Sequence, residues 1–168
     1  GQRFINEDSY HGRIGRTMID QPGDRVWLLV DNSIFERPLE LARIDIAAVG
    51  ETWEEVEKEL GLPEKTLAAT MHFYNEHAKN GEDPLFHRKA KWMKVLTEPP
   101  FAALELNFTQ SFFSFFTLGG LSTRPTGEVL DRGGEPVPGL YAAGRATSGL
   151  PRWGHGYSSG LSLADCTF

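Results

Sequence analysis

Apolar residues along this chain fall into short runs whose spacing differs from one run to the next. The continuous run at 26–31 (Val-Trp-Leu-Leu-Val-Asp) has the length of a buried strand. Residues 51–60 are acidic with apolar positions at helical spacing, and Gly61 follows them, so they predict an amphipathic helix. A second helix is predicted from Pro63 to Lys79, because proline favours the first helical position and the Asn80-Gly81 pair favours an end.

The second predicted helix also indicates a core. Its residues Leu67, Met71, Tyr74 and Ala78 recur at helical spacing, so they share one face and are expected to pack inward. The basic segment 84–100 that follows has no such period and is predicted to be a solvated loop.

The second half of the chain predicts strands and turns. Residues 101–106 and 111–117 are expected to pair as strands, the second of them apolar on both faces. Residues 128–138 predict a hairpin around the turn Arg132-Gly-Gly-Glu. Residues 140–143 predict a short buried strand.

Together these elements predict an α+β fold with two regions. Residues 1–116 form a unit with a helical pair, and residues 117–168 contribute strands and a helix start to a sheet whose other strands lie elsewhere. The helical pattern at 161–168 stops without a cap, and the polar start of the chain has no hydrophobic signal segment. Both ends are therefore expected to be cuts through a larger protein.

Composition excludes several classes of function. The 168 residues are 40% hydrophobic, which is typical of a globular protein, and the net charge of −6 argues against nucleic acid or an anionic membrane as partner. No apolar run approaches the ~20 residues of a membrane helix. The single cysteine, Cys166, fits a cytoplasmic location, and its helical surroundings predict a buried, inert thiol. The histidines lack metal-ligand spacing, so no metal site is expected.

Three glycine-rich turns separate the apolar strands near the end of the chain, at 117–121, 139–145 and 154–160. Glycine lets backbone approach a flat ligand closely, and the helix start after the last turn favours an anion by about 0.3–2 kcal/mol. No Gly-x-Gly-x-x-Gly follows a strand, so this stretch does not encode the pyrophosphate cradle of a dinucleotide fold.

The order of these turns resembles the C-terminal part of the succinate dehydrogenase/fumarate reductase flavoprotein superfamily. Residues 1–7 resemble the opening of that superfamily's capping domain, and further matches lie in its helical part at 61–63, 66–70, 74–76, 81–83 and 86–88. The resemblance implies FAD as cofactor and a substrate-capping domain at 1–116. It also implies that 117–168 is the C-terminal piece of an incomplete Rossmann-like FAD-binding α/β domain whose N-terminal half is missing.

The resemblance also implies a large apolar substrate. Fumarate reductases of the superfamily clamp a dicarboxylate with arginines and a histidine, and the matching positions here are Phe35, Phe116, Tyr157 and Tyr10. Neutral aromatic groups do not offset the desolvation of two carboxylates. Phe35, Phe116 and Trp153 are expected to line a pocket for a steroid-like molecule, although both phenylalanines also suit plain core positions.

The last motifs are similar to those of bacterial 3-ketosteroid dehydrogenases, and in particular of the 3-keto-5α-steroid Δ4 type. They are Ala143-Gly-Arg145, Gly149-Leu-Pro151 and the stretch 156–165. This resemblance implies that Tyr10, Tyr157 and Ser159 are catalytic. The Tyr-Pro-Gly-Ala-Gly-like sequence typical of the Δ1 enzymes is not found at the matching place.

These three residues suggest a hydroxyl relay. Oxidation next to a ketone needs a base for one hydrogen, while the flavin N5 takes the other as hydride. A phenol is mostly protonated at neutral pH, and a second hydroxyl donating to the phenolate helps it act as a base. Tyr157 and Tyr10 are expected to accept the proton, either one being the immediate base, and Ser159 to relay it to solvent. Glu7 is expected either to orient Tyr10 or to pair with an arginine.

By the same resemblance, six residues are expected at the cofactor. Arg145 would lie beside the ribityl chain, and the turn at Gly160 would face the flavin pyrimidine. The predicted set is Gly144, Arg145, Gly160, Leu161, Ser162 and Leu163.

The leading hypothesis is thus an FAD-dependent dehydrogenase of a 3-ketosteroid-like ketone, whose expected partners are that small molecule and the missing N-terminal half. One alternative is a superfamily member with a different substrate. The other is a non-catalytic truncated fragment that lacks the dinucleotide-phosphate site and forms a homo-oligomer through an exposed sheet edge.

Overall fold

The computed structural model describes residues 1–35, 44–109, 117–149 and 153–167. Helices occur together with small antiparallel sheets, so the predicted α+β class is confirmed.

The chain forms two compact units. Unit 1 consists of residues 1–9 and 17–113, and unit 2 of residues 10–16 and 114–168. Helix α1 (His11–Ile19) therefore begins in unit 2 and ends in unit 1. The predicted boundary between 116 and 117 stays a prediction, because residues 110–116 lie outside the described residues.

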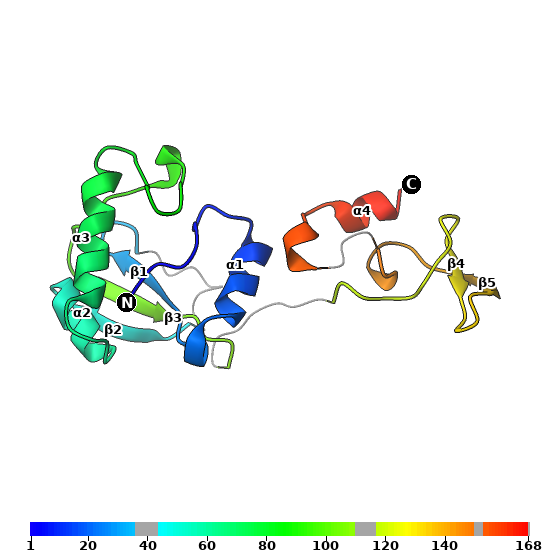
Figure 1. Cartoon of the computed structure of the whole chain (residues 1–168), viewed down its shortest axis with the longest axis horizontal. Helices are drawn as coiled ribbons and strands as arrows, with labels where there is room; N and C mark the ends of the chain where they lie inside the picture. Colours follow the sequence, from blue (N-terminus) through cyan, green and yellow to red (C-terminus); the bar gives the residue numbers. More distant parts are fainter. Residues whose placement is uncertain (36–43, 110–116, 150–152, 168) are drawn as a thin grey trace. The chain divides into compact units, whose positions relative to one another are not determined.

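Unit 1 is built on a three-stranded antiparallel sheet in the order β1-β3-β2 (Figure 1). Its strands are β1 (Trp27–Asp31), β2 (Ile46–Gly50) and β3 (Phe101–Glu105). The strands predicted at 26–31 and 101–106 are thus confirmed. The predicted partner of the second was wrong, because β3 pairs with β1 along one edge and with β2 along the other. Of the range 111–117, only Thr117 is described, and it is not in a strand.

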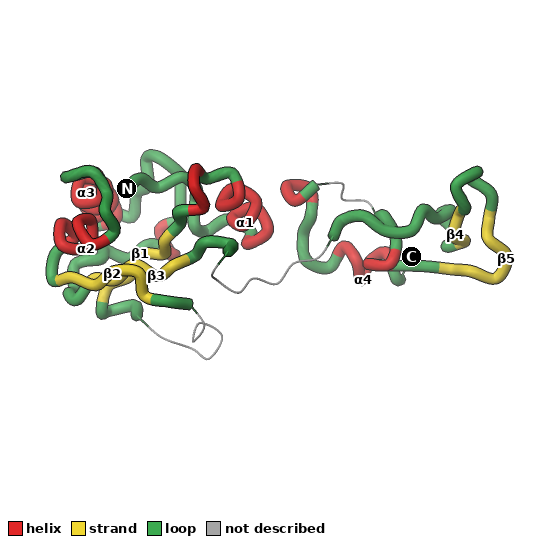
Figure 2. The backbone as a smooth tube through the Cα atoms, turned by 90° about the horizontal axis from the view of Figure 1, so that it is seen from below, coloured by secondary structure: helices red, strands yellow, loops and turns green. Residues whose placement is uncertain are grey.

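Two helices pack together on this sheet, and Figure 2 shows them on the same side of the three strands. They are α2 (Trp53–Glu59) and α3 (Thr66–Ala78). The first helix is confirmed, with Thr52 accepting the Glu55 N–H as its N-cap at 3.2 Å. The second begins at Thr66 instead of Pro63, because Lys65 before it adopts a left-handed φ of 65° that no α-helix continues through.

The core follows the alternation of the central strand. Phe101 and Ala103 belong to the cluster under the helices, while Leu104 packs with a second cluster. The predicted inward face of α3 is confirmed: Leu67, Met71 and Tyr74 are buried, and Ala78 packs against the same cluster.

Apart from the end of α1, the other described residues of unit 1 form turns and loops. The segment predicted as a loop at 84–100 contains one 3-10 turn, η3 (Ala90–Trp92), and another such turn, η1 (Pro22–Asp24), follows α1. The buried carboxylate of Glu57, in α2, accepts hydrogen bonds from the backbone N–H groups of Lys65 and Leu67, each at 2.6 Å. These bonds link α2 to the start of α3.

A partly buried ion pair connects the start of the chain to the loop after α3. Arg3 donates from both terminal nitrogens to the two carboxylate oxygens of Asp83, at 2.9 and 2.8 Å. The same guanidinium also binds Glu7, which lies 3.8 Å from Arg88. The structure therefore shows Glu7 paired with arginines, the second of its two predicted roles.

Replacing Asp83 with asparagine should destabilise unit 1 in a pH-dependent way. Burial alone would raise the pKa of Asp83, but the hydrogen bonds from Arg3 and from the backbone of Arg88 and Phe86 lower it to about 2. The ion pair therefore stabilises the fold fully above the ordinary aspartate pKa of about 4, and this contribution is lost as pH falls towards about 2.

Denaturant unfolding should show Asp83→Asn to be less stable by about 2 kcal/mol near neutral pH. The gap between wild type and variant should shrink on acidification to about pH 2. An equal gap at both pH values would contradict the ion pair as its source.

Unit 2 contains a hairpin and a group of short turns. The hairpin predicted at 128–138 is confirmed as β4 (Glu128–Leu130) and β5 (Pro136–Tyr141). The buried strand predicted at 140–143 was wrong. Leu140 and Tyr141 end the hairpin and are 44% and 65% exposed, since no described layer covers them.

Beside the start of α1, the described residues of unit 2 also form η4 (Gly144–Ala146), η5 (Gly154–Gly156) and α4 (Leu161–Asp165). The helix predicted at 161–168 is thus only five residues long. The prediction that Cys166 is buried was wrong: its thiol is exposed, because the helix end lies on the surface of the unit. Every helix of the described residues is too short or too polar to span a lipid bilayer.

Candidate active site

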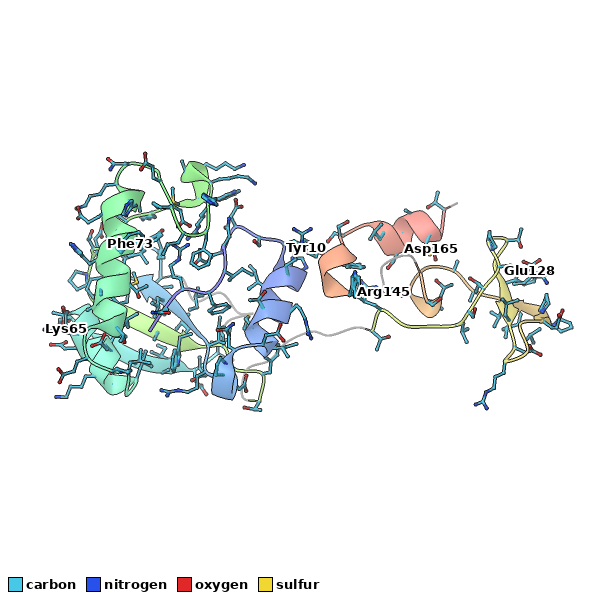
Figure 3. The ribbon with its side chains drawn as sticks, viewed as in Figure 1. Tyr10, Lys65, Phe73, Glu128, Arg145 and Asp165 are labelled. Carbon is cyan, nitrogen blue, oxygen red and sulfur yellow. The ribbon has the colours of Figure 1, made fainter. Side chains whose placement is uncertain are left out.

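Three hydroxyl side chains that the sequence singles out meet in unit 2. The Tyr10 Oη atom lies 3.0 Å from Ser159 Oγ, a hydrogen bond between residues 149 positions apart. The Tyr10 ring centroid lies 6.3 Å from that of Tyr157. Tyr10 immediately precedes α1 (Figure 3), and Tyr157 and Ser159 lie in the turn before α4. The cluster therefore connects the two chain segments of unit 2, residues 10–16 and 114–168.

Arg145 completes this cluster from the 3-10 turn η4. It donates from Nη2 to Tyr157 Oη at 3.0 Å, and its Cζ atom lies 5.7 Å from the centroid of the same ring. Tyr157 is 9% exposed, whereas Arg145 is exposed. The guanidinium thus places a permanent positive charge at the edge of a largely buried phenol.

Asp165, at the end of α4, holds the turn that carries Arg145; both are labelled in Figure 3. Its Oδ2 accepts the Gly144 N–H at 2.6 Å and the Thr147 hydroxyl at 3.1 Å. The same hydroxyl lies 2.8 Å from the Gly144 carbonyl oxygen. This role of Asp165 was not predicted from the sequence. One signal was available, because an acidic residue in the last turn of a helix opposes the helix dipole and so calls for a specific donor.

A small, partly open cavity lies beside Arg145 and Tyr157. It is lined by the predicted cofactor residues Gly144, Arg145, Leu161 and Ser162, together with Tyr157, Asp165 and their neighbours. Its volume of about 30 Å³ admits a water molecule, whereas ligand pockets measure about 300–1,000 Å³. A flavin is too large for this cavity and would have to bind against the surface of unit 2.

The turn before α4 offers such a surface. Gly160 has a φ of 96°, and a Cβ atom there would meet nothing within 4 Å. Leu163, one turn on, is 74% exposed. Open backbone at a positive-φ glycine is what a flat, planar ligand needs for close approach, so these residues fit the flavin that the sequence suggests.

The residues predicted to line a substrate pocket belong to both units, unlike the hydroxyl cluster, which lies within unit 2. Phe35 belongs to unit 1 and is 37% exposed, while Trp153 belongs to unit 2 and is 74% exposed. Phe116 lies outside the described residues. The joint pocket stays a prediction. Within the described part of the chain no cluster of histidine, cysteine or acidic side chains could hold a metal ion.

Comparison with known proteins shows the family of the chain. A model described as an FAD binding domain matches residues 1–161. The chain belongs to this family. FAD is accordingly the cofactor of the complete protein, and the predicted membership of a flavoprotein superfamily with fumarate reductase and ketosteroid dehydrogenase members is confirmed.

Three similar proteins illustrate this membership. The crystal structure of 3-ketosteroid-Δ4-(5α)-dehydrogenase from Rhodococcus jostii RHA1 in complex with 4-androstene-3,17-dione superposes on the whole chain with 41% identity and a TM-score of 0.75. A probable fumarate reductase of Shewanella frigidimarina is 29% identical over 98% of the chain. A 3-oxo-5-alpha-steroid 4-dehydrogenase of Comamonas testosteroni is 28% identical over 86% of it.

The chain spans about a third of the length of these proteins. The covered shares are 35% of the Rhodococcus chain, 27% of the Shewanella protein and 31% of the Comamonas protein.

Proposed function

We propose that the whole protein to which this chain corresponds is an FAD-dependent dehydrogenase of 3-ketosteroid-like ketones. In it, unit 1 would cap the substrate and unit 2 would supply the proton-transfer groups. The observation that carries the proposal is the hydrogen bond between Tyr10 and Ser159, set beside the ring of Tyr157. The 41% identity to a 3-ketosteroid-Δ4-(5α)-dehydrogenase supports the same substrate class.

The proposed reaction removes two hydrogens from neighbouring carbons. The carbon next to the ketone loses a proton, and its electron pair forms the new double bond as the next carbon loses a hydride. FAD, when bound, supplies the acceptor for that hydride. The proton is taken by a tyrosine oxygen, whose own proton has first left through a neighbouring hydroxyl. Tyr10 and Ser159 are hydrogen-bonded as such a transfer requires.

The charge distribution of the cluster suits a ketone better than a dicarboxylate. Tyr10, Tyr157 and Ser159 are neutral donors, and the Arg145 guanidinium donates to Tyr157. A bound dicarboxylate needs cations for both of its ends. The open backbone of Gly160 and of the first turn of α4 would hold the flavin beside these hydroxyls.

Turnover by the whole protein tests this proposal. We expect a 3-keto-5α-steroid with an artificial electron acceptor to give an enone, detected by its ultraviolet absorbance. The matched control is the same steroid without its ketone, which should remain unchanged because its carbon–hydrogen bond is not acidified. Reduction of fumarate without any steroid oxidation would overturn the proposal.

A second candidate is a non-catalytic role for this chain on its own. It is favoured by the water-sized cavity among the predicted cofactor residues and by the lack of a Gly-x-Gly-x-x-Gly motif in the sequence. Titration of the purified chain with FAD would separate the two. Retention of yellow colour after gel filtration would exclude this candidate, and loss of the flavin would support it.

A further inference from the structure

We propose that Arg145 is a positioning residue for Tyr157 and that Asp165 holds it in place. The inference rests on the proposed function, because it gives Tyr157 a task in proton transfer. It also assigns Arg145 a different partner from the ribityl chain of the cofactor.

The contact geometry is the first step. Arg145 Nη2 lies 3.0 Å from Tyr157 Oη, and the guanidinium carbon lies 5.7 Å from the ring centroid. The guanidinium therefore contacts the phenol at its oxygen, where negative charge appears when the proton leaves. A charge-assisted hydrogen bond at this distance stabilises that negative charge more than a neutral donor does.

Asp165 is the second step. Its carboxylate binds the residues on either side of Arg145, namely Gly144 through the backbone and Thr147 through the hydroxyl. Gly144 and Thr147 are both buried, so this turn has little freedom to move. Arg145 thus leaves the backbone from a fixed point, which reduces the conformational entropy lost when it meets Tyr157.

Other titratable groups surround the pair and must be held constant in any test. Tyr10 faces Tyr157 from the residue before α1, and His11 packs on Tyr10 with ring centroids 4.2 Å apart. Asp165 and Cys166 lie at the end of α4. Arg145 is the group whose cationic donor the structure shows on Tyr157 Oη.

The test measures Tyr157 itself as well as turnover. Tyrosine labelled at the ring carbon bonded to oxygen reports by NMR on the hydrogen bond at that oxygen, and Tyr157→Phe assigns the signal. In the whole protein, Arg145→Met should change this signal and move the acidic limb of the kcat–pH profile upward, because the tyrosine oxygen loses its charged donor. Arg145→Lys should move both less, because it keeps the charge but not the planar fork. Asp165→Asn should give a smaller shift in the same direction.

Arg132→Met is the matched control, since it removes the same charge from an exposed position in the hairpin turn of unit 2. It should leave both measurements unchanged. If the Tyr157 signal is the same in Arg145→Met as in wild type, the inference is overturned, whatever the activity. If that signal changes but the wild type oxidises no ketosteroid, the inference stands and the proposed function fails. Loss of FAD from Arg145→Met with an unchanged Tyr157 signal would assign Arg145 to the cofactor instead.

Discussion

Tyr157→Phe should lower kcat for 3-keto-5α-steroid oxidation by about 10²–10⁴-fold while FAD stays bound. The substitution removes only the phenol oxygen, which accepts a hydrogen bond from Arg145 and lies on a ring next to Tyr10. The remaining ring still fills its largely buried place, so the fold should persist. Steady-state kinetics and the flavin absorbance of the purified protein measure the two effects separately.

Tyr141→Phe provides the control for this experiment. Tyr141 also lies in unit 2, at the end of β5, but it is 65% exposed and outside the hydroxyl cluster. Its loss of a hydroxyl should leave kcat unchanged. Full activity of Tyr157→Phe would remove Tyr157 from the proposed reaction. A fall in activity that matched a fall in flavin content would assign it to cofactor binding.

Gly144→Ala should destabilise unit 2 by about 3 kcal/mol. Gly144 has a φ of 62°, where a side chain is strained, and a Cβ atom there would overlap Cys166 Sγ and lie 3.1 Å from the Ser162 carbonyl oxygen. The crowding would push α4 away from η4 and weaken the Asp165 hydrogen bond to the Gly144 N–H. Thermal or denaturant unfolding of the purified chain measures the loss.

Gly134→Ala separates backbone strain from crowding. Gly134 has a φ of 84°, but a Cβ atom there would meet nothing within 4 Å. This variant should cost only about 1 kcal/mol. Adding Cys166→Ala to Gly144→Ala should recover part of the lost stability, because it removes the overlapping sulfur. Equal destabilisation by the two glycine variants would show that packing of α4 on η4 contributes nothing.

Local patterns predicted many of the elements correctly. The acidic helix at 51–60, the inward face of α3 and the hairpin at 128–138 all follow from periods and turn residues within about a dozen positions. The wrong predictions concerned burial, which depends on what packs against a residue. Cys166 and Leu140 carry apolar side chains in regular patterns, yet both are exposed, because a period describes one face of an element and not what covers it.

The sequence by itself determined the α+β class, the principal helices and strands, and the glycine-rich motifs typical of a flavoprotein. Only the tertiary structure decided which distant residues contact one another. Three contacts join residues far apart in the sequence: the hydrogen bond between Tyr10 and Ser159, the pairing of β3 with its two neighbours, and the hydrogen bond that Asp165 accepts from Gly144. Such contacts arise from packing of whole elements, and hydrophobic periodicity carries no information about which distant segments will meet.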